Sequence, residues 1–96
     1  GSALGFSVDS IRPNPSRGTT AISFSLPETG WIHARIVDAG GRAVRALLDA
    51  PLRAGRQSLI WDGRNDQGRS VGSGVFFLRI ETEAGVSRSA RLLRVE

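Results

Sequence analysis

Short runs in which apolar and polar residues alternate fill most of this chain, and they constrain its fold more than any other feature. The first full run places Ile22, Phe24 and Leu26 on one side and small polar residues on the other. The pattern is found in residues 20–26, 31–37, 57–61, 75–83 and 87–95. Successive side chains of a β-strand point to opposite faces of the sheet, so this period of two predicts half-buried strands.

Turn-forming residues separate these runs. The prolines of Pro13-Asn14-Pro15 restrict the residues before them to extended or turn conformations and end a first strand around residues 6–11. Residues 26–30 and 84–85 are predicted hairpin loops, and the tight turn at Gly40-Gly41 needs a positive φ that glycine supplies. The proline segment is expected to be the hinge to whatever precedes the domain, with an ordinary edge-strand break as the alternative.

Residues 42–50 are the one segment whose pattern is ambiguous. Val44, Leu47 and Leu48 have the spacing of one helix face, but the segment follows a Gly-Gly turn and stops at Pro51. We therefore expect a strand there as well. Frequent turns between short strands then predict an all-β chain, a single immunoglobulin-like antiparallel β-sandwich of about seven strands.

The inward-facing apolar residues of these strands form the predicted core. They are Ile22, Phe24, Leu26, Ile32, Ala34, Ile36, Val44, Leu47, Leu52, Leu59, Trp61, Phe76, Leu78, Ile80 and Leu93. In the last strand, Leu93 and Val95 are expected on one face and the arginines on the other. Trp61 is in phase with Leu59, which favours burial of its ring. Trp31 is out of phase with the core residues of its strand, so we expect it to be partly exposed.

The composition excludes several classes of function. The chain has no cysteine, so disulfides, cysteine nucleophiles and thiolate metal sites are ruled out. All 13 basic residues are arginines spread along the chain, which favours a solvated surface over a nucleic-acid site. No apolar run approaches the roughly 18 residues of a membrane-spanning helix. Gly1-Ser2 is interpreted as a cloning scar, which leaves residues 3–96 as one domain.

No constellation of catalytic residues is visible in the sequence. His33 is the only histidine and lacks a second histidine or a nucleophilic serine with elbow glycines, so we expect it at the surface. No segment ends in the Gly-Lys-Ser or Gly-Lys-Thr of a phosphate-binding loop. We therefore expect no enzyme activity and no catalytic residues. A sugar-stacking role for Trp31 is a further, weaker hypothesis.

One loop is rich in Asp, Asn and Gly and allows two interpretations. Asp62, Asn65 and Asp66 carry the oxygen ligands that Ca²⁺ prefers. However, Arg64 occupies a position where a standard calcium loop needs an acid. Hydrogen bonds from these side chains to backbone N–H groups are therefore the favoured interpretation. No cofactor is expected, and calcium is kept as the alternative.

An ordered series of short motifs resembles a known family. The series comprises Pro13-Asn14-Pro15 and residues 20–27, 36–38, 41–45, 54–55, 61–63, 68–69 and 73–77. In this order it resembles the FlgD-type immunoglobulin-like domain and, equally, the C-terminal sorting domains of type IX secretion cargo. The positions that mark the motifs are Pro13, Asn14, Pro15, Gly41, Trp61, Asp62, Gly63, Gly68 and Gly74.

The resemblance implies a non-catalytic accessory domain at the C-terminus of a larger exported bacterial protein. Its partners would be the upstream domain of that protein and the outer-membrane secretion machinery. Its location would be the cell surface or the medium, reached through the periplasm of a Gram-negative-type bacterium. In this sorting role the last strand would be recognised through its exposed edge and through Arg88, Arg91, Leu92, Leu93, Arg94 and Val95.

Two other roles stay open at this point. A domain of the flagellar hook-capping type would act as a structural or assembly spacer. A carbohydrate- or calcium-binding appendage of a secreted hydrolase would use Trp31 or the loop from Asp62 to Asp66.

Overall fold

A computed structural model describes residues 5–95, so the expected cloning scar at Gly1-Ser2 lies outside the described residues. Between these limits the chain forms seven strands and no helix. The strands are β1 (Ser7–Arg12), β2 (Thr20–Leu26), β3 (Gly30–Asp38), β4 (Ala43–Leu52), β5 (Gly55–Trp61), β6 (Gly74–Thr82) and β7 (Ser87–Arg94). The all-β prediction is confirmed, and the ambiguous segment 42–50 forms a strand from Ala43 onward, which continues through Pro51.

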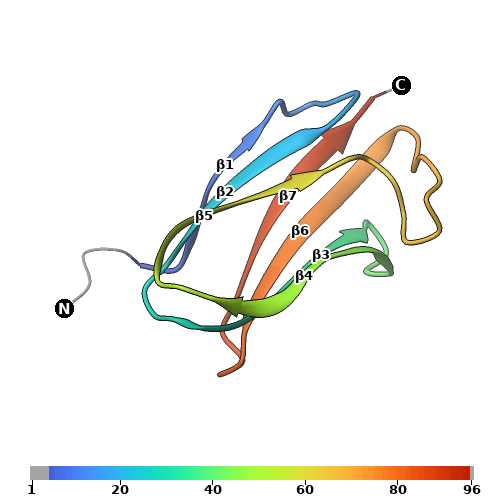
Figure 1. Cartoon of the computed structure of the whole chain (residues 1–96). Coiled ribbons are helices and arrows are strands. Elements are labelled where there is room, and N and C mark those ends of the chain that lie inside the picture. Colours follow the sequence, from blue (N-terminus) through green and yellow to red (C-terminus); the bar gives the residue numbers. More distant parts are fainter. Residues whose placement is uncertain (1–4, 96) are drawn as a thin grey trace.

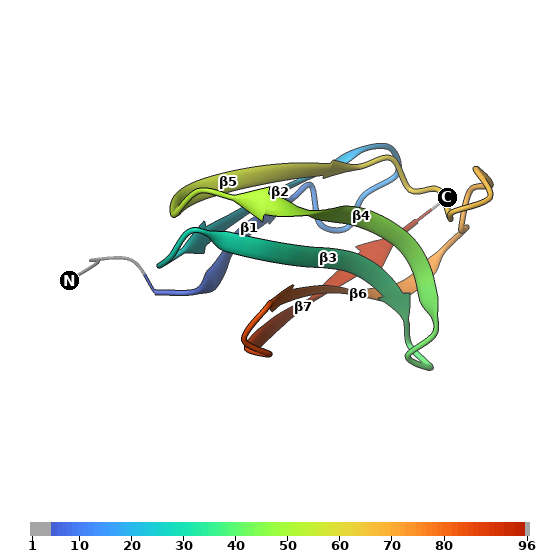
Figure 2. The same ribbon diagram turned by 60° about the horizontal axis from the view of Figure 1, so that its bottom comes forward.

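The strands form two antiparallel sheets that pack against each other (Figure 1). One sheet has the order β1-β2-β5 and the other the order β4-β3-β6-β7. Figure 2 shows the two sheets as two layers. In this view β4 of one sheet and β5 of the other lie on the same side of the molecule. The predicted immunoglobulin-like sandwich of about seven strands is therefore confirmed.

The core lies between the two sheets and consists mainly of the residues that the alternation predicts. The predicted residues that are buried are Ile22, Phe24, Leu26, Ile32, Ala34, Ile36, Trp61, Phe76, Leu78 and Ile80. Other predicted members pack against this cluster and are only partly buried: Val44, Leu47, Leu52 and Leu59. These four lie on β4 and β5, which are edge strands and are covered by fewer neighbours.

The last strand has the opposite phase from the one predicted. Leu92 is buried, Leu93 is only partly buried, and Val95 is exposed. The pairing with β6 explains this, because Leu92 lies opposite the core residue Phe76 and directly paired residues point to the same face. Arg94 also points inward, so the prediction that the arginines of this strand face away from the core is wrong at that position.

The segment Pro13-Asn14-Pro15 lies along the outer edge of β7. The Asn14 side chain accepts a hydrogen bond from the Leu93 N–H at 2.9 Å and donates one to the Arg91 carbonyl at 3.2 Å. The Ser16 N–H donates to the Leu93 carbonyl, and the Ser16 carbonyl accepts from the Val95 N–H, both at 3.0 Å. Because β1 of the same sandwich precedes this segment, the hinge prediction is wrong and the segment is an edge-strand break.

Candidate functional site

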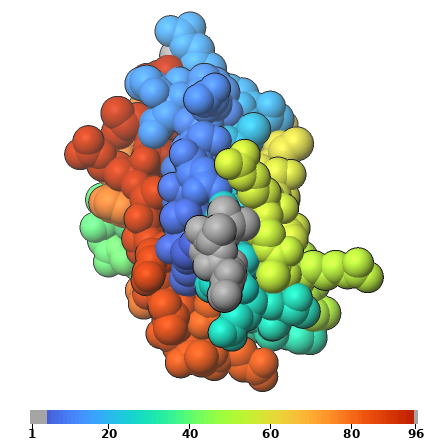
Figure 3. Space-filling view, turned by 90° about the vertical axis from the view of Figure 1, so that its left-hand side faces the viewer, coloured from blue at the N-terminus to red at the C-terminus, as the bar shows by residue number. Residues whose placement is uncertain are grey.

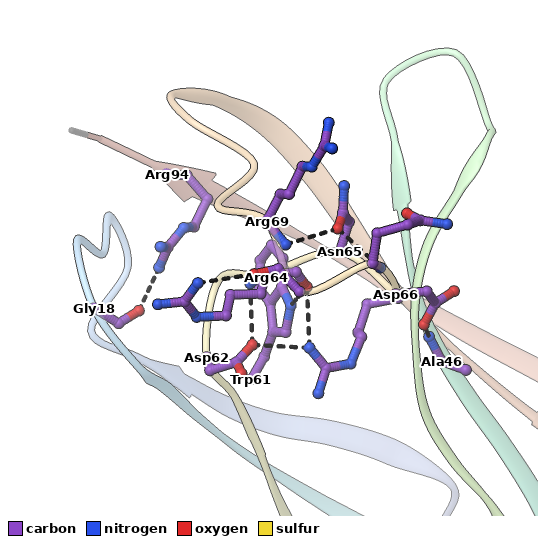
Figure 4. Close-up of polar contacts among 12 residues, drawn as sticks. Gly18, Ala46, Trp61, Asp62, Arg64, Asn65, Asp66, Arg69 and Arg94 are labelled. Atoms are coloured by element: carbon purple, nitrogen blue, oxygen red, sulfur yellow. Dashed lines mark hydrogen bonds and ion pairs between the residues drawn. The ribbon is translucent and has the colours of Figure 1, made fainter.

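The loop between β5 and β6 is shaped by its own Asp and Asn side chains (Figure 4). Asn65 Oδ1 accepts hydrogen bonds from the backbone N–H groups of Gln67 and Arg69, both at 3.0 Å. Asp62 Oδ1 accepts one from the Arg64 N–H at 3.0 Å. These are the backbone-capping contacts that the sequence favoured.

The same loop is joined to the free edge of β4. Asp66 Oδ1 accepts a hydrogen bond from the Ala46 N–H at 3.0 Å, and the Asp66 N–H donates to the Val44 carbonyl at 3.0 Å. Arg45 Nη1 forms an ion pair with Asp62 Oδ1 at 3.0 Å. The loop therefore satisfies polar backbone groups that an edge strand otherwise leaves to solvent.

The oxygen atoms of this loop do not fit a shared calcium shell. Figure 4 shows the side chains of Asp62, Asn65 and Asp66 directed at different partners. The Oδ1 atom of each already accepts at least one N–H, and the Asp62 atom also pairs with a guanidinium. Within residues 5–95, no group of three or more His, Cys, Asp or Glu side chains is placed to hold a metal ion.

Arg94 is a buried cation at the end of β7, with 6% of its surface exposed. Nη1 donates hydrogen bonds to Ser16 Oγ at 3.1 Å and to the Gly18 carbonyl, while Nη2 donates to the Arg17 carbonyl at 3.3 Å. Among the described residues, no carboxylate lies within ion-pair distance of it. Carbonyl dipoles of the loop before β2 therefore take the place of a counter-ion.

The guanidinium of Arg94 also lies against the Trp61–Gly63 segment. Its carbon is 5.3 Å from the centroid of the Trp61 ring, and Trp61 Nε1 donates to the Arg64 carbonyl at 2.9 Å. At Gly63 (φ 77°) a Cβ atom would lie 1.9 Å from Arg94 Nη2, so a larger residue there requires the guanidinium of Arg94 to move. The Trp-Asp-Gly motif thus leaves room for the arginine of the last strand. The other motif glycines, Gly41, Gly68 and Gly74, also have positive φ.

An apolar patch with one arginine covers part of the outer face of the four-stranded sheet. This outer patch consists of residues that pair across β3, β6 and β7: Val37, Val75, Phe77, Arg91 and Leu93. Val75 and Arg91 are exposed and the others are partly buried. Sequence reasoning included Arg91 and Leu93 but missed Val75 and Phe77. The signal was present, because β6 is apolar on both of its faces at this end.

Three of the remaining predicted recognition residues, Leu92, Arg94 and Arg88, do not join the outer patch. Leu92 and Arg94 are buried, so their side chains are not on the surface. Arg88 lies toward the other end of β7, where its Nε donates to the Phe6 carbonyl at 3.0 Å and its guanidinium covers the Phe6 ring. Val95 is exposed, but its N–H already donates to Ser16. The predicted free edge is thus covered along the second half of β7.

Trp31 and His33 share one acceptor at the surface of β3 and β4. Trp31 Nε1 donates to Asp49 Oδ1, and His33 Nδ1 lies 2.9 Å from the same oxygen. Trp31 is 41% exposed, which confirms the expectation from its phase. His33 is exposed as expected. Asp49 therefore holds the indole ring in a fixed orientation without burying it.

In the part of the chain that the structure describes, there is no helix that could cross a membrane.

No family model and no curated protein matches this chain. FlgD from P. aeruginosa shares its fold with 22% identity and a TM-score of 0.63, over 78% of this chain and 60% of FlgD. FlgD from Xanthomonas campestris is 22% identical, with a TM-score of 0.56 over 92% of this chain and 66% of that chain.

Two proteins of Porphyromonas gingivalis contain the same fold. Dimeric latent PorU is 18% identical, with a TM-score of 0.73 over 96% of this chain and 10% of PorU. PorZ, described as an essential surface component of the type IX secretion system, is 21% identical, with a TM-score of 0.60 over 93% of this chain and 11% of PorZ. This chain thus spans less than two thirds of the P. aeruginosa FlgD chain and about a tenth of PorU and PorZ. The chain has the FlgD-like immunoglobulin-type fold, which is also found in these two proteins.

Proposed function

We propose that this domain is a non-catalytic accessory module of a larger exported bacterial protein and serves in secretion sorting or surface attachment. The supporting observation is the occurrence of the same fold as about a tenth of PorU and PorZ, the latter a surface component of a type IX secretion system. Its partners are the upstream part of its own parent protein and the outer-membrane secretion machinery. The parent is secreted or displayed at the cell surface after passing through the periplasm, and the domain uses no cofactor.

The outer patch is the surface that this function would use. It combines exposed apolar area with a phenylalanine and an arginine, and aromatic residues and arginine are enriched at protein interfaces. Arg91 forms no ion pair with any residue from 5 to 95, so its charge is available to a partner. Leu93 lies beside Val75, so the exposed side chains of the last strand act together with those of β6.

The test is the export of a reporter fused to residues 3–96 in a bacterium with a type IX system. A truncation after Val86 is an unsuitable control, because it removes Leu92 and Arg94 from the core. Arg91→Glu and Leu93→Ser alter the outer patch and leave the buried residues Leu92 and Arg94 in place, so we expect both variants to fold. Ile60→Ser is the matched control, since Ile60 is 70% exposed on the other sheet.

We expect the wild-type fusion and Ile60→Ser to be released or displayed equally, and both outer-patch variants to stay in the periplasm while folded. Export of all four proteins at the same level would contradict recognition through the outer patch. Periplasmic retention of the folded wild-type fusion would contradict the sorting role as a whole.

A structural or assembly role is the second candidate, and the comparison with FlgD favours it. The matched domain makes up 60% and 66% of the two FlgD chains, one of which is described as essential for flagellar assembly through hook capping. In that case the sandwich is a spacer whose faces pack against neighbouring subunits. Retention of the folded wild-type fusion in the export experiment is the outcome that this role predicts.

A further inference from the structure

A hollow of about 560 Å³ opens at the end of the sandwich opposite the outer patch. It lies between the β2–β3 loop, the β6–β7 hairpin and the residue that precedes β1. In Figure 3 the β2–β3 loop, in teal, and the β6–β7 hairpin, in orange, lie near each other at the lower end of the molecule. Its apolar walls are formed by Phe6, Leu26, Pro27, Trp31, Ile32 and Val86. The volume is within the range of about 300–1,000 Å³ that is typical of ligand sites.

Two apolar residues in the walls of this hollow, Trp31 and Val86, are exposed, and several of the wall residues are held in place by hydrogen bonds or packing. Trp31 is 41% and Val86 45% exposed, although both are large apolar residues. The Trp31 indole is fixed by its hydrogen bond to Asp49, and the backbone carbonyl of Trp31 accepts a hydrogen bond from the Glu83 N–H at 3.2 Å. The Phe6 ring is backed by the guanidinium of Arg88 at 5.1 Å. A ligand would therefore meet a preformed apolar surface and lose little free energy in ordering it.

The charge of the hollow differs from that of the whole chain. The chain carries 13 arginines against 9 acidic residues, for a net charge of +4. The hollow is lined by two ionisable residues, Glu28 and Glu83, and by no arginine. Arg88 lies against Phe6 but does not line the hollow. Both glutamates are exposed, so they are free to meet a cation at the rim.

We propose that this hollow binds an extended peptide segment that carries a bulky apolar side chain next to a Lys or Arg. The apolar side chain fills the space between Trp31 and Val86, and the neighbouring cation pairs with Glu28 or Glu83. A carbohydrate is the competing occupant, because Glu28, Thr29, Thr82 and Glu83 offer hydrogen-bond partners to its hydroxyl groups. The leucine, isoleucine, proline and valine walls favour an apolar side chain over sugar hydroxyl groups, which they would leave unpaired. This site lies apart from the outer patch, so it does not depend on the sorting role.

The chain contains a reporter for this site. Trp61 is fully buried, whereas Trp31 lines the hollow, so a ligand should change the fluorescence of Trp31 alone. The probe is a blocked hexapeptide with a central Phe-Arg pair, titrated beside a Phe-Glu peptide, an Ala-Arg peptide and cellohexaose. We expect the Phe-Arg peptide to bind with a Kd of about 100 μM and the other three to bind at least about tenfold more weakly.

Two variants locate the binding, and one serves as a control. Val86→Asp places a charge in an exposed hairpin residue of the wall and should weaken binding at least about tenfold. Glu83→Arg should weaken binding of the Phe-Arg peptide about 2–5-fold and strengthen binding of the Phe-Glu peptide. Ile60→Asp changes an exposed residue of β5 at the end of the β2–β5 pair away from Leu26, so this variant should bind like the wild type. Thermal melting checks that each variant is folded.

Three outcomes would overturn the proposal. The first is the absence of any saturable change with the Phe-Arg peptide. The second is equal or tighter binding of cellohexaose, which would make the hollow a sugar site. The third is unchanged peptide binding by folded Val86→Asp and Glu83→Arg, which would place the peptide elsewhere.

Discussion

The guanidinium of Arg94 lies over the Trp61 ring at the meeting point of the two sheets, 5.3 Å from the ring centroid. Trp61 ends β5 in the three-stranded sheet, and Arg94 ends β7 in the four-stranded sheet. Phe76 packs edge-on against the same indole, with 5.6 Å between ring centroids. A desolvated cation–π contact contributes about 2 kcal/mol or more, so this pair connects the last strand to the opposite sheet.

Replacement of Trp61 tests that connection. Trp61→Ala should lower the free energy of unfolding by about 3–5 kcal/mol, because it empties a large core volume and removes the partner of Arg94. Trp31→Ala is the matched control and should change stability far less, since its ring is partly exposed. Urea unfolding followed by circular dichroism measures both. A Trp61→Ala protein with a wild-type midpoint would show that the ring is not in the core.

Two glycines with nearly the same backbone conformation separate backbone strain from crowding. Gly63 and Gly68 have φ of 77° and 81°, but only at Gly63 does Arg94 occupy the space of a Cβ atom. Gly68→Ala should therefore be destabilised by about 1 kcal/mol from the backbone alone. Gly63→Ala should lose at least about twice as much. Equal losses in chemical denaturation would mean that Arg94 moves aside without penalty.

The loss of folding stability at low pH should depend on the carboxyl group of Asp38. Its Oδ1 accepts the N–H groups of Arg42 and Gly40, both at 2.9 Å, and the bond from Arg42 is the main cause that lowers the pKa of this carboxyl. The unfolded chain, with an ordinary aspartate pKa near ~3.9, then binds more protons than the folded chain. This contribution to stability is fully present above that value and is lost as the pH falls through the lower folded pKa.

Asp38→Asn keeps an acceptor in the turn and removes the titration. The variant should lose less stability than the wild type when the pH is lowered from about 5 to about 2. Hydrogen bonds from Ser25 and Ser7 also lower the pKa of Asp9, so part of the acid sensitivity should remain. Urea midpoints across this pH range give the comparison. Identical pH profiles for the two proteins would exclude a role of Asp38.

Calcium should leave the stability of the domain unchanged. The Asp62, Asn65 and Asp66 Oδ1 atoms accept protein N–H groups, and these bonds are the reason for the expectation. We expect the same melting temperature with EDTA and with millimolar Ca²⁺. A calcium-dependent increase that disappears in Asp66→Asn would restore the metal hypothesis. Mg²⁺ at the same ionic strength is the control for general screening.

The strands and most of the core could be predicted because each strand turns one face to the interior. Ile22, Ile32 and Leu78 follow from period-two alternation alone. The last strand could not be phased in this way, because its inward face contains Arg94 and its outward face contains Leu93. The residue type alone does not tell a buried arginine from a solvated one, and only the pairing with β6 shows which arginine of this strand faces inward.

The surfaces were harder to predict than the core. The motif at Trp61–Gly63 was recognised, but its contact with Arg94 joins positions far apart in the sequence. The hollow is likewise assembled from Phe6, the β2–β3 loop and the β6–β7 hairpin, which no local pattern connects. Trp31 could be predicted as exposed from its phase, whereas the concavity beside it depends on how the two sheets are placed at that end.

The alternation of buried and exposed residues along β7 makes the last strand a test of completed folding. Arg91 and Leu93 face outward at their observed spacing only while Leu92 and Arg94 are held inside. The cover provided by Asn14 and Ser16 leaves side chains rather than the backbone edge for a partner near the end of this strand. A receptor that contacts this face would therefore bind folded copies of the domain and not unfolded ones. Recognition would then also serve as quality control of folding.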